Sequence, residues 1–547
     1  MKVLLIQPPI RDFYRTSIRT QPLGLAYLAA SLRECGHEVE ILDGQTEKKK
    51  SIPIPSELSY LKEFYPSYDR SPFKLYSGYH HFGMEWDEIK RRIEESGAQV
   101  FGISSSFTPY HPEALETARI IKTWDQRKVV VMGGAHVSCD PEGVLRSPFV
   151  DHVILGEGEL RFPFLLDKIE GKVERVLEAD GTGCKVDGEI RIYPLKSFIE
   201  RLDALSFPAR DLLDLDRYRI RKKRSTMIIT SRGCPHRCAY CSAHLVMGPS
   251  FRARSPQAIL QEMIECRSRY GIEIFDIEDD NFTFDSRRAK ELMRMIIETF
   301  GEERLELSAM NGISFASLDR ELLGLMKRAG FKSVNLSWVS ADPVLKEKMK
   351  RPGLSTDFDQ TLRDVEETGL GAVVYAIFGL PGQRVEEMVQ TLIDLMGKRV
   401  LIGPSIYYPT RGTPLFKECE RAGMLPSQPS RWRSSAFPVE TEHFTRLDLV
   451  TLLRLTRAVN FIKASINEKL LDEGLTWKEM ARWRRGRPPS PSWIEFLLEG
   501  IESGSFPAAR SLKDGTRAIR PLAASGKVLG LFLEKASHQP ILGTRNS

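Results

Sequence analysis

Short apolar, β-branched runs alternate with helix-like segments over most of the first four hundred residues, and this alternation constrains the fold more than any other feature. Strands separated by helices imply βαβ units, and hence parallel sheets whose strands are covered on both faces. In the first 195 residues the strand-like runs are KVLLIQ, EVEILD, QVFGISS, KVVVMGG and HVILGEG. From 225 to 416 six further strands follow, among them STMIITS, EIFDIED and AVVYAIFG.

The two alternating series predict two different α/β architectures. Residues 1–195 are expected to form a doubly wound, Rossmann-like sheet. Residues 225–416 are expected to form a partial (β/α)6 barrel, because the series is shorter than the ~250 residues of a full eightfold barrel. A polar linker spans 196–224, and 417–547 is predicted to be a mostly helical C-terminal domain whose role the sequence does not indicate.

Between the second and third strands lies a stretch, 44–85, that is rich in Tyr, Phe, Pro and Lys. At about 40 residues it is too long for an ordinary connection, so it is predicted to be a functional flap or lid. The whole chain has 547 residues, which is too many for one hydrophobic core.

Composition narrows the class of protein. No apolar run approaches the ~18 to 20 residues of a membrane span, and MKVLLIQPPI is typical of a first strand, not of a secretory signal. We therefore expect no membrane span and a cytoplasmic location. Net charge is +6, carried in local runs such as 221–224 and 482–487, so no nucleic-acid partner is expected. Five scattered cysteines indicate a reducing compartment without disulfides.

The other three cysteines, Cys234, Cys238 and Cys241, stand in a C-x3-C-x2-C spacing directly after the first strand of the second series. Catalytic loops of β/α barrels lie at such strand ends. A structural zinc site would need a fourth ligand, usually from a second cysteine pair or an H-x3-5-H motif, and neither is present nearby. Three thiolates on one short loop instead suit a 4Fe-4S cluster whose fourth iron stays open.

This stretch, TSRGCPHRCAYCSAH, resembles the radical S-adenosylmethionine (radical SAM) family, whose motif is C-x3-C-x-aromatic-C. The resemblance implies that Cys234, Cys238 and Cys241 hold the cluster and that the open iron binds S-adenosylmethionine. It also implies that a reduced cluster cleaves this cosubstrate to give a 5'-deoxyadenosyl radical. Tyr240 would pack against the bound nucleoside, although an aromatic residue in a barrel loop is more often simple packing.

Two later strand ends resemble cosubstrate-binding segments of that family. EDDNF would meet the amino group of S-adenosylmethionine, and GLPGQ would lie along its adenine. Helix caps and tight turns use the same residue types, so these alternatives stay open. The candidates are Asp279, Asp280 and Asn281 in the first segment and Gly379, Pro381 and Gly382 in the second.

One segment departs from the family pattern. After the fourth barrel strand many relatives carry Gly-x-Glu-Ser, whereas this chain has LSWVSAD, with Val339 in place of the acid and Ser340 retained. Ser340 is kept as a cosubstrate candidate. A carboxylate contact at the position of Val339 is lost or supplied from elsewhere.

The first series resembles the cobalamin-binding domain of cobalamin-dependent radical SAM proteins, through GISSSFT, GGAHVSCDPE and GEGE. Small residues at the strand ends would admit the nucleotide tail of the cofactor. His136 is placed near that tail and not assigned as a cobalt ligand; an unliganded Rossmann-like scaffold is the alternative. The candidates are Ser104, Ser105, Ser106, Gly133, Gly134, His136, Ser138, Gly156, Glu157, Gly158 and Glu159.

Together the resemblances imply a cobalamin-dependent methyltransferase that acts on an unactivated carbon of a small molecule or peptide. An external one-electron donor, such as flavodoxin or ferredoxin, would reduce the cluster. The alternatives are a cyclase or rearrangement enzyme, a methylthiotransferase, which would need three more clustered cysteines, and a non-enzymatic cofactor carrier. Specificity is expected around Tyr407, Tyr408 and the lid-like stretch. No catalytic acid or base can be named.

Overall fold

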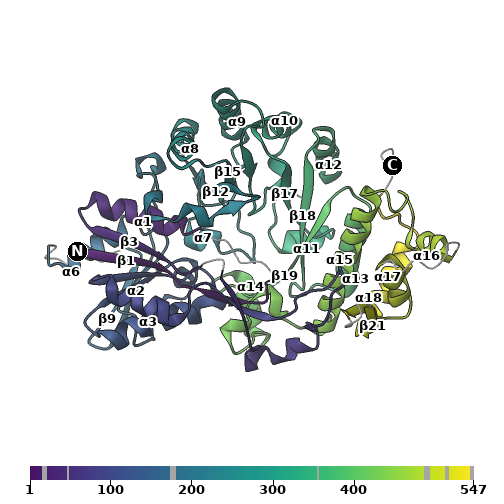
Figure 1. The fold of residues 1–547 in the computed structure, drawn as a ribbon, viewed down its shortest axis with the longest axis horizontal. Coiled ribbons are helices and arrows are strands. Elements are labelled where there is room, and N and C mark those ends of the chain that lie inside the picture. Colours follow the sequence, from purple (N-terminus) through teal and green to yellow (C-terminus); the bar gives the residue numbers. More distant parts are fainter. Residues whose placement is uncertain are drawn as a thin grey trace.

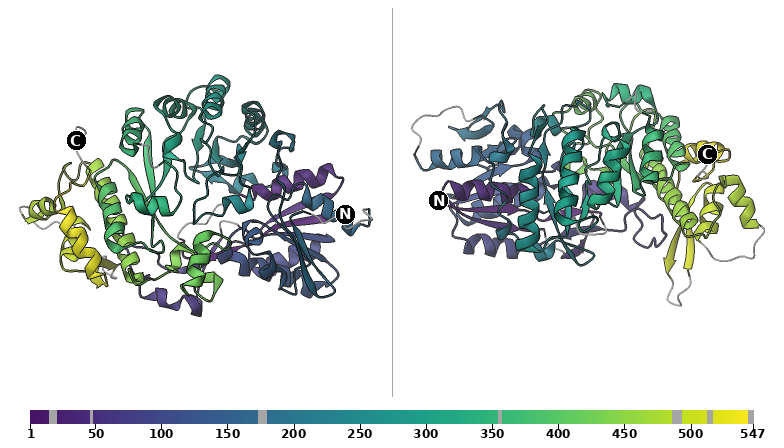
Figure 2. Two further views of the ribbon diagram at one scale, coloured as in Figure 1. Left: turned by 180° about the vertical axis from the view of Figure 1, so that it is seen from behind. Right: turned by 90° about the horizontal axis from the view of Figure 1, so that it is seen from above.

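The computed structural model places a seven-stranded sheet and a set of C-terminal helices at opposite sides of a central arc of strands (Figure 1). Figure 2 shows the same arrangement from behind and from above. The structure describes residues 1–14, 21–45, 48–172, 180–353, 357–485, 493–511 and 517–542. The end of the basic run 482–487 therefore lies outside the described residues.

The N-terminal sheet has the strand order β10-β9-β8-β7-β6-β1-β3, and its first five strands along the chain are parallel. Apolar cores cover both of its faces, which explains why β1 is buried almost throughout. The antiparallel pair β9 and β10 extends one edge. The strands are β1 (Lys2–Gln7), β3 (Glu38–Asp43), β6 (Val100–Ser104), β7 (Val129–Gly133), β8 (His152–Ile154), β9 (Thr182–Val186) and β10 (Glu189–Tyr193).

Helices pack on both faces of this sheet. α1 (Leu23–Glu34) and α6 (Arg161–Ile169) contribute to one core, and α2 (Trp86–Glu95) and α3 (His111–Trp124) contribute to the other. The short helix α4 (Ala135–Cys139) begins directly after β7. The sheet is thus doubly wound, as the alternating sequence predicts.

The central arc is a partial barrel of six parallel strands. Three of them pair as β12-β15-β16 and three as β17-β18-β19, and bridges at Leu307–Phe331 and Ile313–Leu336 join the two halves. The predicted partial (β/α)6 barrel is confirmed. Its strands are β12 (Lys223–Ile228), β15 (Ile274–Ile277), β16 (Glu306–Ser308), β17 (Ser333–Val339), β18 (Gly371–Phe378) and β19 (Leu401–Ile406).

The helices on the outside of the barrel carry clear start and stop signals. α8 (Pro256–Tyr270) begins at Ser255, whose hydroxyl accepts from the Ala258 amide, and ends at the left-handed Gly271. Aspartate caps start the next helices, which form the outer rim in Figure 1. They are α9 (Ser286–Phe300), α10 (Arg320–Ala329) and α12 (Phe358–Glu367), whereas α13 (Val385–Met396) begins at Arg384 without an aspartate cap.

The predicted lid is built into the body of the protein. Its strands β4 (Lys49–Ile52) and β5 (Tyr79–Phe82) form a small antiparallel sheet with β2 (Ile10–Asp12). Phe73 is fully buried in the same core as the barrel and the C-terminal helices. The described residues of 44–85 therefore form a packed insert, which we call the insert below.

The C-terminal segment is mostly helical, as predicted, but it also contains a hairpin of β20 (Phe506–Ser511) and β21 (Arg517–Leu522). Its helices share one apolar core with the barrel, so the boundary predicted at 416 and 417 stays a prediction. Among the described residues, no helix is long and apolar enough to span a membrane. The helices are α14 (Pro414–Arg421), α15 (Arg446–Asn467), α16 (Trp477–Arg485), α17 (Trp493–Glu502) and α18 (Gly526–Ala536).

Candidate functional site

The three motif cysteines lie on one loop that is closed at its base by a short ladder. β13 (Ser231–Arg232) pairs with β14 (Arg252–Ala253), and the cluster loop, 233–251, runs between them. It contains the short helix α7 (Ala243–Val246). All three thiols line one cavity of about 500 Å³ at the mouth of the barrel, which we call the cluster cavity.

Donors approach each of the three sulfur atoms. The Ala243 amide donates to Cys241 Sγ at 3.5 Å, Asn281 Nδ2 lies 4.0 Å from Cys234 Sγ, and Arg351 Nη1 lies 4.0 Å from Cys238 Sγ. Burial raises the pKa of the Cys241 thiol to about 11, so this thiol is neutral unless a metal ionises it. N–H groups around the sulfurs are what a bound iron-sulfur cluster requires.

The spacing of the sulfurs also bears on the zinc alternative. Among the described residues, the one group of three ligand atoms lying within 4.8 Å of one another is formed by His37, Asp167 and Glu170. The three cysteine sulfurs are therefore more widely spaced than that. A single zinc ion with Zn–S bonds of about 2.3 Å would draw its sulfurs closer together. The donor set fits a polynuclear cluster better than one zinc ion.

The acidic segment after β15 divides between the cavity and the protein interior. Asp280 and Asn281 line the cluster cavity, and Asn281 Oδ1 is buried without a partner, free to accept a hydrogen bond from a bound group. Asp279 is buried and accepts from the Thr230 amide at 2.6 Å and from Ser231 Oγ at 2.6 Å. It braces the stem of the cluster loop, and its side chain does not line the cavity.

The other cosubstrate candidates are placed differently from one another. Tyr240 and Val339 line the cluster cavity, whereas Ser340 is fully buried against Thr391 at 3.2 Å. The GLPGQ turn does not line the cavity in the described structure. There, Gln383 Oε1 accepts from the amides of Gly379 and Leu380, and the turn around Pro381 and Gly382 leads into α13.

Arg351 was missed at the sequence level. It lies in the cluster cavity, donates from Nη2 to the Ser337 carbonyl at 2.7 Å, and leaves Nε buried without a partner. Val339, beside it, has a φ of +77°, a left-handed conformation that is costly for a β-branched residue and that accompanies a bulge in β17. The Arg351 guanidinium therefore gives the cluster cavity a charged group on the side where Val339 replaces the expected acid.

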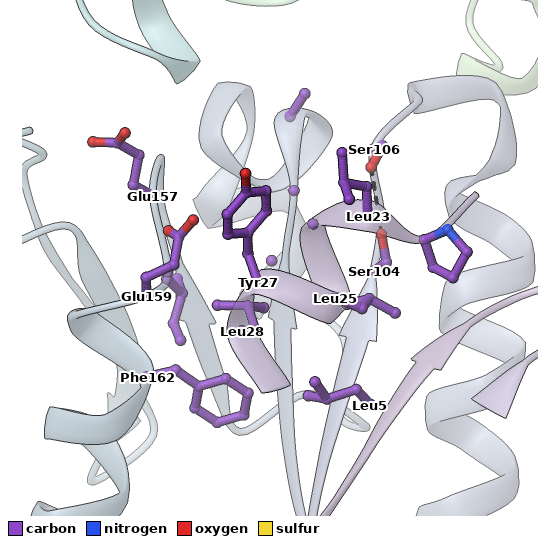
Figure 3. Close-up of a pocket in the computed structure, with 18 of the residues that line it drawn as sticks. Leu5, Leu23, Leu25, Tyr27, Leu28, Ser104, Ser106, Glu157, Glu159 and Phe162 are labelled. Carbon is purple, nitrogen blue, oxygen red and sulfur yellow. Dashed lines mark hydrogen bonds between the residues drawn. The ribbon is translucent and has the colours of Figure 1, made fainter. Parts of the chain in front are cut away.

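The second cavity, of about 320 Å³, opens at the carboxyl end of the N-terminal sheet, and we call it the sheet cavity. Figure 3 shows apolar Leu25, Leu28 and Phe162 deep in it, with Ser104 and Ser106 on one side and Glu157 and Glu159 on the other. The predicted residues that line it are Ser104, Ser106, Gly133, Gly134, Gly156, Glu157, Gly158 and Glu159.

The remaining candidates of this domain brace the sheet cavity from outside it. Ser138 Oγ donates to the Gly134 carbonyl and accepts from the Gly156 amide, both at 2.9 Å, which ties two glycine loops together. Ser105 Oγ lies 3.0 Å from His111, and His136 lies 3.0 Å from Thr108 Oγ1. Burial lowers the pKa of His136 to about 4, so its ring is neutral.

A glycine lets the wall of the sheet cavity take its shape. Gly134 has a φ of +116°, and a Cβ at this position would lie 2.7 Å from the Ser105 carbonyl oxygen. Only glycine tolerates both constraints. Ala135, the next residue, lines the sheet cavity and the cluster cavity, and so do Val246 and Met247 from the cluster loop. The two cavities therefore meet at one shared wall.

Two protein-family models match the two parts of the chain in which the cavities lie. The radical SAM superfamily model matches residues 228–395, and the B12 binding domain model matches residues 78–166. The chain belongs to the B12-binding radical SAM family. Its 4Fe-4S, S-adenosylmethionine and cobalamin cofactors are those predicted from the sequence. The assignment of individual residues to each cofactor stays a prediction.

Relatives match most of the chain. An uncharacterized methyltransferase of Pyrococcus horikoshii is 28% identical over 461 residues, 83% of this chain and 91% of its own length. The cytidylyl-2-hydroxyethylphosphonate methyltransferase of Streptomyces wedmorensis is 29% identical over 473 residues, 79% of this chain and 84% of its own. The methyltransferase TsrM of Kitasatospora setae shares the fold, with a TM-score of 0.58, 19% identity and coverage of 79% and 81% of the two chains.

Beneath the cluster cavity, the radical SAM barrel holds a pair of acids. Asp276 accepts from Ser308 Oγ at 2.7 Å, and Glu278 accepts from Asn311 Nδ2 at 2.8 Å. Burial, with the Asp276 charge next, raises the pKa of Glu278 to about 7. Asn311 also lines the cluster cavity, so this polar group lies next to it.

Proposed function

We propose that this radical SAM protein is a cobalamin-dependent methyltransferase that methylates a carbon of a polar small molecule. The observation that carries the proposal is the shared wall: Ala135, Val246 and Met247 line the sheet cavity and the cluster cavity at once. A methyl carrier held in the first can thus meet a substrate held in the second. The names of the relatives, methyltransferases in most cases, support the same reaction.

When bound, the cluster with S-adenosylmethionine supplies radical initiation by one electron, and cobalamin supplies methyl transfer. The residues of the chain position and enclose these groups. Cys234, Cys238 and Cys241 would hold the cluster. Asp280 and Arg351 offer opposite charges within the cluster cavity, which suits the ammonium and carboxylate groups of an amino acid moiety.

The polar lining indicates the substrate class. Besides the cluster ligands, the cluster cavity presents Asn311, Ser314, Ser337 and Tyr375. A bound hydrocarbon could not form hydrogen bonds with these polar side chains, which argues against a purely apolar lipid as the substrate. A small molecule that carries hydroxyl, amino or phosphoryl groups satisfies them. We propose a substrate of this kind, with an external flavodoxin-like or ferredoxin-like electron donor in the cytoplasm.

The test is anaerobic reconstitution with iron, sulfide and hydroxocobalamin, followed by iron and cobalt quantification. A reductant-driven assay then measures 5'-deoxyadenosine and S-adenosylhomocysteine. We expect both metals to be retained and both products to form, because methyl transfer from S-adenosylmethionine leaves S-adenosylhomocysteine. Retention of iron with no cobalt would contradict the proposal for the first domain.

A cyclase or rearrangement enzyme is the second candidate. It is favoured by the anaerobic magnesium-protoporphyrin IX monomethyl ester cyclase of Synechocystis, which is 23% identical over 404 residues. Such an enzyme would release 5'-deoxyadenosine without S-adenosylhomocysteine in the same assay, even with both metals bound. The ratio of the two products therefore separates the candidates.

A further inference from the structure

The two ends of the cluster loop are closed by a pair of arginines that face each other. Arg232 on β13 is paired with Arg252 on β14, in a ladder of only two residues per strand. Every cysteine of the motif lies between them, on 233–251. Whatever holds these two arginines therefore holds both stems of the cluster loop.

One carboxylate of the N-terminal domain contacts both arginines. Arg232 Nη1 donates to Glu157 Oε1 at 2.9 Å, and Arg252 Nη1 lies 2.9 Å from both Glu157 oxygens. Arg232 Nη2 donates to Glu159 Oε1 at 2.6 Å. The side chains of Glu157 and Arg252 are 0% and 3% exposed, so water does not compete for these bonds.

The loop that carries Glu157 is itself fixed. The Ile199 amide donates to Glu157 Oε2 at 2.8 Å, and Arg161 Nη1 donates to the Glu157 carbonyl at 2.7 Å. Gly156 precedes it with a φ of +63°, and a Cβ there would lie 3.1 Å from the Val246 carbonyl oxygen of the cluster loop. The glycine thus allows the two loops to approach closely.

The same loop lines the sheet cavity. Gly156, Glu157, Gly158 and Glu159 all border it, and Figure 3 shows both carboxylates beside the cavity. Arg232 borders it too, with its guanidinium 5.3 Å from the centre of the Tyr27 ring. The carboxylates of the GEGE segment are therefore already engaged by arginines in the described structure.

We propose that Glu157 is a positioning residue that fixes the cluster loop relative to the B12-binding cavity. Two buried guanidinium groups and two carboxylates balance in charge, and the bonds from both stems converge on one side chain. Loss of the Glu157 charge leaves both guanidiniums partly uncompensated in the interior, and the stems then shift to regain hydrogen bonds. The proposal rests on the proposed function only in requiring that both cofactors bind.

The test uses the reconstituted full chain, loaded with iron, sulfide and hydroxocobalamin and reduced with dithionite. In this state both the cluster and cob(II)alamin are paramagnetic, so the cluster accelerates relaxation of the cobalt spin in a distance-dependent way. The measurement is the microwave power that half-saturates the cobalt signal in electron paramagnetic resonance. For Glu157→Gln we expect the half-saturating power to change about two-fold or more. Sites of this kind tolerate displacements of only ~0.5 Å, and a larger displacement of the cluster loop changes the distance between the two spins.

Glu265→Gln, which removes a carboxylate from an exposed pair with Arg269 on α8, is the matched control and should saturate as the unsubstituted protein does. Full loading of Glu157→Gln with unchanged saturation would overturn the proposal and show that the contacts of Glu157 with Arg232 and Arg252 do not position the cluster loop. If Glu157→Gln does not bind both the cluster and cobalamin, the same measurement is made on Glu157→Asp, which keeps the charge but shortens the side chain. A shifted saturation in that variant supports the proposal, and an unshifted one overturns it.

Failure of the proposed function has a different signature. The unsubstituted protein would then bind iron without cobalt, or neither metal, before any variant is compared. Retention of both metals in the unsubstituted protein, with identical saturation in every variant, counts against the role of Glu157 alone.

Discussion

At the scale of single residues, the cysteine motif makes the most direct prediction. Replacing Cys234, Cys238 or Cys241 with Ala should lower bound iron from about four atoms per chain to less than one after reconstitution, because the chain then offers the cluster only two of its three thiolates. Iron quantification and the visible absorbance of the cluster measure this. Cys35→Ala is the control, since that thiol is exposed and remote from the motif. An alanine variant of the motif with full iron content would contradict the assignment.

Gly134 makes a separate prediction for the other cofactor. Gly134→Ala should abolish retention of cobalamin on gel filtration while leaving iron content unchanged. A Cβ would lie 2.7 Å from the Ser105 carbonyl oxygen, and the φ of +116° is unfavourable for alanine. Gly530→Ala on α18 is the control, because a Cβ there meets no atom within 4 Å. Equal cobalt retention in both variants would show that this wall does not hold the cofactor.

Glu278 predicts a pH dependence of stability. Its pKa is raised to about 7 in the folded protein, first by burial and then by Asp276, from about 4.3 in an unfolded chain. The folded state holds the proton more tightly, so the free energy of unfolding falls as pH rises from about 4.3 to 7 and then levels off. Glu278→Gln, which can still accept from Asn311, should therefore be stabilised relative to the unsubstituted protein by about 3 kcal/mol more at pH 8 than at pH 4.

Urea denaturation at the two pH values measures this difference. Glu265→Gln serves again as the control, because its carboxylate is exposed. A stability difference for Glu278→Gln that does not change with pH would show that the acid is not perturbed.

The sequence could predict which segments meet at the site, but not which way each side chain points. Asp279 and Asp280 are adjacent in the chain, yet one braces the cluster loop and the other faces the cavity, because the loop after β15 turns their side chains to different sides. Ser340 is buried for the same kind of reason. Arg351 has no local signal, since it reaches the cavity only through the path of the loop after α11 (Pro343–Lys348).

At the scale of elements, the insert shows where a sequence argument from length alone misleads. Its length and aromatic content predict a lid, but the aromatic residues are used to build a core with α15. Arg454 of α15 is buried and donates from Nη2 to the Phe64 carbonyl at 2.7 Å, and Asp69 lies 3.9 Å from it. The insert is therefore anchored by a buried charge that the local sequence does not reveal.

Arg454→Met should loosen this anchor without a large change in packing volume. We expect faster amide hydrogen exchange in residues 56–75, because the Phe64 carbonyl and the Asp69 carboxylate lose their buried partner. Exchange in the N-terminal sheet should be unchanged and provides the internal reference. Arg399→Met is the control, because it removes a pair with the exposed Glu473 and leaves Arg454 in place. Equal exchange in both variants would mean that the apolar contacts alone hold the insert.

At the scale of the whole molecule, the sequence predicts each α/β unit but not how the units join. Parallel strand patterns are local signals, and both sheets follow from them. The joints are made by charged residues far apart in the chain, such as Glu157 with Arg252 and Asp12 with Arg433. In the sequence these residues are indistinguishable from solvated surface charges, which is the usual location of such residues.

These joints predict that the chain unfolds as one unit. Arg433, from the segment after the barrel, donates to Asp12 Oδ2 at 3.0 Å and to the Pro109 carbonyl at 2.9 Å, with its side chain 5% exposed. Separating the sheet from the barrel would expose or orphan these groups on both sides. We therefore expect a single calorimetric transition, and Arg433→Met should lower the stability of the whole chain by about 3 to 5 kcal/mol.

Scanning calorimetry, with intrinsic fluorescence as a second probe, distinguishes coupled from independent units. Arg363→Met on α12 is the control, since its contacts with Gln360 and Asp357 are exposed. Two transitions, of which only one moves in Arg433→Met, would show that the sheet and barrel are thermodynamically separate. A single transition that shifts as a whole means that the sheet and the barrel unfold together. The shared wall at Ala135, Val246 and Met247 requires this coupling if methyl carrier and substrate are to meet in a fixed geometry.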